Sequence, residues 1–106
     1  MAHESMEVDR LGVPAHALAE LARRHQLREL SIFGSVLRSD FRPDSDVDVL
    51  IEFEPGEMMT IERFLRIQDE LESLFGRRVD LVEKPLLRNP YRRGEILRTR
   101  RVLYAA

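Results

Sequence analysis

Hydrophobic and polar residues alternate most regularly over residues 46–53, where the chain reads DVDVLIEF. A period of two is typical of a β-strand that buries one face. One face carries Val47, Val49, Ile51 and Phe53, and the other carries Asp46, Asp48, Leu50 and Glu52. We therefore predict a strand here, ended by the turn-forming pair Pro55 and Gly56, with two faces of very different polarity.

Two other stretches repeat their apolar residues at helical spacing. The first covers residues 14–25, with Pro14 in its first turn and basic residues in its last. The second ends at Phe75, between Thr60 as the N-cap residue and Gly76 as the residue that terminates the helix. A last helix is expected over residues 91–101, with a frayed end.

Two further short strands are predicted, over residues 29–33 and 78–83. In the later strand Val79 and Leu81 lie on one face, whereas Asp80 and Val82 lie on the other.

Between the first two strands a short helix is expected over residues 35–39, followed by a turn at 42–45. This order of elements predicts an α/β or α+β domain over residues 14–106, preceded by a flexible tail over 1–13. Its sheet is expected to be small and mixed, with three to four strands and with helices on one side.

The composition excludes several kinds of chemistry. The 106 residues include no cysteine, which rules out disulfides, thiolate metal sites and cysteine nucleophiles. No stretch approaches the roughly 18 apolar residues of a membrane span, and the first ten residues lack the apolar centre of a secretory signal. We therefore expect a soluble cytoplasmic protein.

The net charge of -2 argues against nucleic acid as a partner. Arginines nevertheless gather near the C-terminal end, at Arg88, Arg92, Arg93, Arg98, Arg100 and Arg101. They form either a solvated helix face or a surface that meets an acidic partner or a nucleotide phosphate.

Three aspartates are the candidate metal ligands and catalytic residues. Asp46 and Asp48 leave the same strand face about 6–7 Å apart, where their like charges repel unless a cation lies between them. Oxygen ligands in this pattern suit Mg²⁺ or Mn²⁺. If the strand that carries Asp80 is adjacent, all three carboxylates can hold two metal ions, and the least tightly held can accept a proton from an attacking hydroxyl.

Two alternatives apply to this acidic cluster. The aspartates can simply be acids on the wet face of an edge strand. A calcium loop of the EF-hand type would use Asp44, Asp46 and Asp48, but Val49 and Pro55 replace the glycine and the glutamate that such a loop requires.

Candidate phosphate-binding residues lie just upstream. Gly34 and Ser35 end a predicted strand and open a helix, which allows a close backbone approach and offers free N–H groups to an anion. Arg38 lies one turn further on and can neutralise phosphate charge, or else pair with Asp40. Ser45 can contact a phosphate or cap the turn. The Gly-Lys-Ser/Thr segment of a P-loop is absent.

Taken together, these residues resemble the motif of the minimal nucleotidyltransferases (MNT) of the DNA polymerase β-like superfamily. That motif is Gly-Ser, two residues and Arg, then Ser-Asp-x-Asp, and a third Asp on a later strand; the positions here are Gly34, Ser35, Arg38, Ser45, Asp46, Asp48 and Asp80. The resemblance extends over residues 15–104. Leu37 and Ser39 differ from the family's smaller residues and would narrow the entrance to the phosphate site.

The resemblance implies ATP as substrate, a pair of Mg²⁺ ions, and transfer of AMP to a hydroxyl with release of pyrophosphate. It also implies a role as the antitoxin of a HEPN–MNT toxin–antitoxin pair, in which a tyrosine of the HEPN toxin is adenylylated within a hetero-oligomer. Two hypotheses therefore stand: a protein adenylyltransferase, or a non-catalytic antitoxin that neutralises its partner by binding alone.

Overall fold

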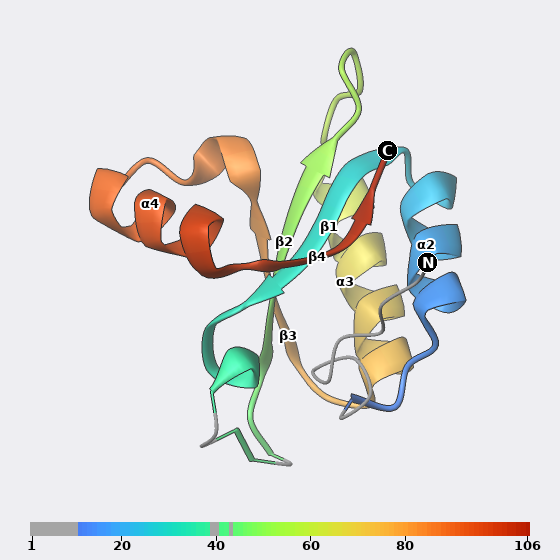
Figure 1. Ribbon diagram of the computed structural model, residues 1–106. Helices are drawn as coiled ribbons and strands as arrows, with labels where there is room; N and C mark the ends of the chain where they lie inside the picture. Colours follow the sequence, from blue (N-terminus) through green and yellow to red (C-terminus); the bar gives the residue numbers. More distant parts are fainter. Residues whose placement is uncertain (1–10, 39–40, 43) are drawn as a thin grey trace.

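A four-stranded sheet is the frame of the computed structural model, which describes residues 11–38, 41–42 and 44–106 (Figure 1). The strands are β1 (Leu27–Phe33), β2 (Val47–Phe53), β3 (Val79–Glu83) and β4 (Arg101–Ala105), in the order β3-β2-β1-β4. β1 pairs antiparallel with β2 and β4, whereas β2 and β3 run parallel. The predicted mixed sheet flanked by helices is confirmed.

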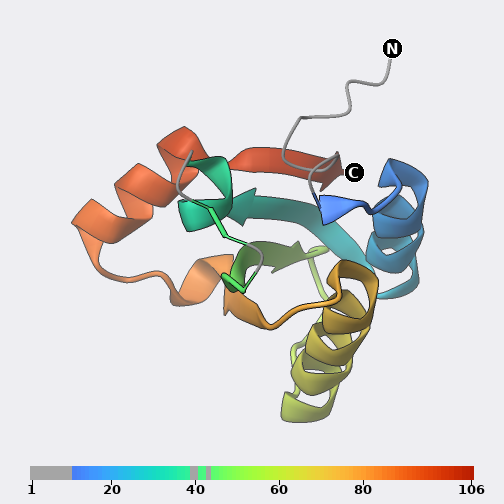
Figure 2. The same ribbon diagram turned by 90° about the horizontal axis from the view of Figure 1, so that it is seen from below.

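Helices α2 (Ala15–Arg24) and α3 (Ile61–Phe75) cover one face of this sheet (Figures 1 and 2). The main core lies between them and the sheet and includes Val47, Val49 and Ile51, which are fully buried. The alternation read from the sequence therefore assigns the two faces of β2 correctly. None of the helices in the described part of the chain is long and apolar enough to cross a membrane.

The opposite face of the sheet is also covered, by the 3₁₀ turn η2 (Lys84–Leu86) and helix α4 (Pro90–Thr99) (Figure 2). A second, smaller core joins Phe33 and Leu50 of the sheet to Leu87 and to Ile96 of α4. The expectation of helices on one side alone is therefore wrong. Leu50 is the physical reason, because an apolar side chain on the polar face of β2 needs a cover of its own.

Local signals set the helix ends. Thr60 Oγ1 accepts a hydrogen bond from the Arg63 amide, and Gly76 ends α3 with φ +69°. Both caps are as predicted. The Asn89 side chain caps α4 by accepting hydrogen bonds from two backbone amides of its first turn.

The predicted last helix is present as α4, but the chain after it forms a strand in place of the frayed end that we predicted. α4 stops at Thr99, and β4 then pairs with β1, with Tyr104 opposite Leu30. The predicted tail over 1–13 is also too long, because Leu11 and Val13 are buried in the main core. Residues 1–10 lie outside the described part of the chain.

A buried carboxylate fastens α4 to the sheet. Glu29 of β1 is only 7% exposed. Its oxygens accept hydrogen bonds from Arg100 Nε at 2.5 Å, Ser31 Oγ at 2.6 Å and Lys84 Nζ at 3.2 Å. Arg100 follows α4 directly and Lys84 begins η2, so this one side chain ties both ends of the η2–α4 segment to the central strand.

The same contacts set the pKa of Glu29. Burial alone would raise this pKa, but the hydrogen bonds from Arg100, Ser31 and Lys84 outweigh it and lower the pKa from 4.5 to about 2. A carboxyl group whose folded-state pKa is depressed stabilises the fold above its unfolded pKa. The contribution is lost as the pH falls from 4.5 through about 2.

We expect Glu29→Gln to lower the free energy of unfolding at pH 7 by about 2–4 kcal/mol, because Arg100 and Lys84 would lose their buried counter-charge. The loss should shrink steadily below pH 4.5, where the wild-type carboxyl begins to lose its advantage. Urea unfolding between pH 2.5 and 7 measures this difference. Glu20→Gln, on the exposed side of α2, serves as the matched control, and equal losses in the two variants would contradict the assignment.

Candidate active site

The turn after β1 is built around a glycine. Gly34 has φ +77°, a conformation that side chains other than glycine rarely adopt. It opens the 3₁₀ turn η1 (Gly34–Leu37), which the Arg38 amide closes by donating to the Ser35 carbonyl at 2.9 Å. The predicted helix over 35–39 is thus a single 3₁₀ turn as far as the described residues show. Gly34 and Ser35 therefore do not open an α-helix whose free N–H groups could bind an anion, as we had expected.

Gly34 lies directly against Asp48 of β2. A Cβ atom added to Gly34 would be 2.2 Å from Asp48 Oδ2 and 3.2 Å from its Cγ. The backbone N–H of Ser35 also donates to the Asp48 carboxylate. The antiparallel pairing that sets Phe33 opposite Asp48 creates this contact. The structure therefore brings together two parts of the motif that are 14 residues apart in the sequence.

Asp48 and Asp80 lie side by side. β2 and β3 pair in parallel with Asp48 directly opposite Asp80, so the two side chains leave the same face of the sheet. Asp48 is half-buried and Asp80 is exposed, and the two carboxyl groups are close enough to share a hydrogen bond. The sequence hypothesis required adjacent strands at this point, and the sheet provides them.

Burial and the nearby negative charges together raise the pKa of Asp48. Burial is the largest cause, and the negative charge of Asp80, their mutual hydrogen bond and the charge of Asp46 act in the same direction. The Ser35 amide opposes them by stabilising the carboxylate. The pair therefore behaves as a site that favours a cation or a shared proton.

Asp46 has a different partner, although its charge still acts on Asp48. It precedes β2 and forms an ion pair with Arg78, whose Nε lies 3.5 Å from Asp46 Oδ1, and both side chains are exposed. Within residues 11–38, 41–42 and 44–106 no three His, Asp or Glu side chains are arranged to hold a metal ion. The structure thus assembles two of the three predicted ligands and leaves the third at the edge.

The donor set nevertheless fits a divalent cation. The carboxylates of Asp48 and Asp80 repel each other, and a cation between them would relieve this repulsion. Ligand sets made of oxygen atoms alone suit Mg²⁺. The Asp46–Arg78 pair is exposed, and such pairs contribute only about 0–1 kcal/mol. Asp46 can therefore exchange Arg78 for a cation held by Asp48 and Asp80. A calcium loop is excluded, because residues 47–53 form a strand.

Ser45 has a structural role in the turn before β2. Its Oγ accepts a hydrogen bond from the Arg42 amide at 3.1 Å, and its carbonyl accepts one from Arg77 at 3.3 Å. These bonds favour the turn-capping alternative over a phosphate contact. For Arg38, the alternative partner Asp40 lies outside the described residues.

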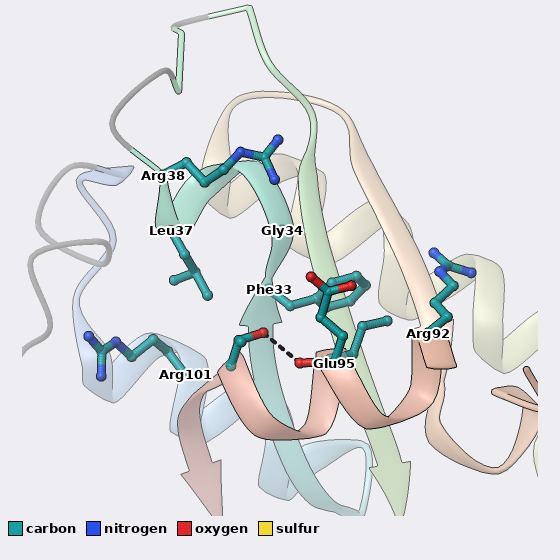
Figure 3. A pocket seen from close by; sticks show the side chains of 9 residues that line it. Phe33, Gly34, Leu37, Arg38, Arg92, Glu95 and Arg101 are labelled. Atoms are coloured by element: carbon teal, nitrogen blue, oxygen red, sulfur yellow. Dashed lines mark hydrogen bonds between the residues drawn. The ribbon is translucent and has the colours of Figure 1, made fainter. Parts of the chain in front are cut away.

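A pocket of about 510 Å³ opens in front of Gly34 and Arg38 (Figure 3). Its far wall is α4, which contributes Arg92 and Glu95 among other residues. From the sequence, Arg92 stood out only as one of several C-terminal arginines, and Glu95 was not identified as a site residue. The sequence did contain a signal for Glu95. Asn89 and Pro90 mark the start of α4, and from that start Arg92 and Glu95 fall on the same face of the helix.

Comparisons with known proteins agree with this geometry. Residues 16–103 match the family described as the nucleotidyltransferase domain. The chain is 43% identical over 70 residues to protein adenylyltransferase MntA of Thermococcus cleftensis, which covers 66% of this chain and 69% of that protein. It is 37% identical over 71 residues to a candidate protein adenylyltransferase of Methanocaldococcus jannaschii, covering 67% of this chain and 70% of the relative.

Solved structures show the same fold. A candidate minimal nucleotidyltransferase superposes with a TM-score of 0.70 at 36% identity, covering 95% of this chain and 98% of that one. A toxin–antitoxin complex with AMP-PNP contains a chain that superposes with a TM-score of 0.70 at 17% identity, covering 89% of this chain and 75% of that one.

We expect Gly34→Ala to destabilise the protein by about 1–3 kcal/mol, because the new methyl group would collide with Asp48 in a backbone conformation that alanine resists. Gly94→Ala is the matched control, since a Cβ at Gly94 of α4 meets no atom within 4 Å and alanine favours a helix. Urea unfolding of both variants tests this. Equal stability of Gly34→Ala and the wild type would show that Gly34 does not constrain Asp48.

We expect Asp48→Asn to raise the melting temperature at pH 7 by about 2–5 °C. A raised folded-state pKa means that the charged form of Asp48 destabilises the fold above that pKa, and the amide removes the charge while still accepting from Ser35. The gain should vanish as the pH falls and Asp48 becomes protonated. Calorimetry against Asp69→Asn, on the exposed face of α3, measures it, and a gain that persists in acid would refute this explanation.

Proposed function

Because the chain belongs to the nucleotidyltransferase domain family, we propose that it transfers AMP from ATP to a hydroxyl group of a partner protein, and that it acts in this way as an antitoxin. The acceptor that we propose is a tyrosine of a HEPN-type toxin. The observation that carries the proposal is the contact between the Gly34–Ser35 turn and the paired carboxylates of Asp48 and Asp80.

The residues present can each take a part in this transfer. The acceptor hydroxyl oxygen attacks the α-phosphorus of ATP, the bond from that phosphorus to the bridging oxygen breaks, and pyrophosphate leaves. We assign the uptake of the hydroxyl proton to Asp80, because it is the exposed member of the carboxylate pair. Ser35 and Arg38 contact the phosphates from the side of η1.

Asp48 and Asp80, joined by Asp46, would hold Mg²⁺, with Mn²⁺ as an alternative. When bound, the ion neutralises phosphate charge and orients the triphosphate. Asp48 is fixed for this purpose by the Ser35 amide and by the close approach of Gly34. Ser45, which is engaged in its turn, contributes to the site by positioning Asp46 next to it.

The choice of partner rests on the relatives. Those that align over about two thirds of the chain carry the name protein adenylyltransferase, and a more distant fold relative is described as an MNT antitoxin in complex with a HEPN toxin. A protein acceptor also suits a small domain, because it brings its own binding surface.

The direct test uses α-labelled ATP, Mg²⁺ and a HEPN-type protein encoded beside this chain. We expect label on the HEPN protein with the wild type, and a rate lower by about 10²–10⁴-fold for Asp80→Asn, which cannot accept the proton. Asp48→Asn should be inactive although it folds, and Asp69→Asn should match the wild type.

Two results would count against the proposal. Label transfer that does not depend on Asp48 and Asp80 would reject the site. No transfer by the wild type, combined with protection of cells by the Asp48→Asn and Asp80→Asn double variant on co-expression with the toxin, would establish neutralisation by binding alone.

A further inference from the structure

The pocket between η1 and α4 continues the proposed phosphate site towards the C-terminal part of the chain. It shares Gly34 and Arg38 with that site, and its volume of about 510 Å³ lies within the range of small-molecule and cofactor pockets. The roles proposed above use only the η1 side. The α4 side, with its own charged residues, is still without a role.

The charge of this pocket is opposite to that of the protein. Among the described residues that line it are three arginines, Arg38 after η1, Arg92 from α4 and Arg101 from the start of β4, and one acidic residue, Glu95. The chain as a whole has a net charge of -2. A local excess of guanidinium groups attracts a polyanion, and guanidinium groups bind phosphate oxygens in pairs.

The walls of the pocket are partly apolar. Phe33, Leu37 and Ile96 line it together with the charged residues, and Phe33 and Ile96 belong to the small core beneath α4. An apolar wall beside a cationic rim suits a ligand with a flat, weakly polar ring at one end and phosphates at the other. A nucleotide has this form.

Arg92 and Glu95 are three residues apart on α4, where opposite charges usually pair. In this structure they point separately (Figure 3). Among the described residues, no hydrogen bond or ion pair engages the Arg92 guanidinium or the Glu95 carboxylate. The contact of Glu95 is made by its main-chain carbonyl, which accepts from Thr99 Oγ1 at 2.7 Å. Both charged groups are therefore available to a ligand in the pocket.

A carboxylate would repel phosphates, so Glu95 must face a part of the ligand that donates hydrogen bonds. Ribose hydroxyl groups are such donors, and an acidic side chain is a familiar partner for them. Arg92, one turn away, can contact the phosphates from the side opposite to Arg38.

We propose that the pocket between η1 and α4 takes the nucleoside part of the substrate, with Glu95 accepting hydrogen bonds from the ribose hydroxyls and Arg92 binding the phosphates. This inference rests on the proposed function. The wall is fixed in place, because the Glu29–Arg100 contact and the small core around Ile96 hold α4 against the sheet. Glu95 thereby becomes a specificity residue for ribonucleotides.

Calorimetric titration of the full chain, without a partner protein, tests the proposal with three probes: ATP, 2′,3′-dideoxy-ATP and inorganic tripolyphosphate. Each is measured with Mg²⁺ and with EDTA. For the wild type we expect ATP to bind about 10-fold more tightly than the dideoxy analogue, the size of an effect of hydrogen bonds to a charged group. Glu95→Ala should abolish this preference and leave tripolyphosphate binding unchanged or stronger.

Arg92→Ala should weaken all three probes by about 5–10-fold, because it removes a charged phosphate contact. Arg98→Ala and Glu62→Ala are the matched controls, since both residues are exposed and neither lines the pocket. If Glu95→Ala keeps the ribose preference, or Arg92→Ala binds like Arg98→Ala, this inference is overturned even where AMP transfer is intact. If the wild type binds no nucleotide at all, the proposed function falls with it.

Discussion

The arrangement of the site depends on one constraint, the parallel pairing that sets Asp48 opposite Asp80. Two like charges at neighbouring positions on one sheet face oppose folding. The pairing holds because the other face of the same strands is largely apolar and is buried against α2 and α3. A shift of β3 by one residue would turn Val79 and Leu81 out of that core. The core therefore fixes the register, and the register brings the carboxylates together.

The face of the sheet that α4 covers carries both the charged site and the contacts that hold α4 in position. Along β1 this face runs from buried Glu29, through Ser31, to Phe33 beside Gly34. Glu29 binds Arg100 and Lys84 at one end, and Phe33 packs under α4 at the other. The helix that walls the pocket is thus held by a buried charge network away from the reaction centre. Changes in that network should reach the pocket through the position of α4.

The sequence predicted those features that depend on period and on local caps. The faces of β2 and the capping of α3 by Thr60 and Gly76 follow from residues that are close in the chain. The shared face of Asp48 and Asp80 followed only on the condition that their strands are adjacent, which the sheet meets. The predictions from sequence failed where contacts between residues far apart in the chain determine the structure. Arg101–Ala105 forms a strand because β1 offers it an open edge, and nothing local to RVLYA signals that edge. Likewise, the pairing of Asp46 with Arg78 depends on where β3 begins.

Two features of the site lower the stability of the fold, and they help to decide between catalysis and neutralisation by binding alone. Gly34 adopts a conformation that few residues tolerate and leaves no room for a side chain next to Asp48. Asp48 is held half-buried beside another carboxylate, which raises its pKa. An antitoxin that only covers its partner needs neither feature, and most substitutions at Asp48 that remove the charge would relieve the repulsion. Residues that are less favourable for stability than the alternatives at the same position are typical of functional sites. Two such residues in direct contact, opening onto a cationic pocket, favour a working nucleotidyl-transfer site.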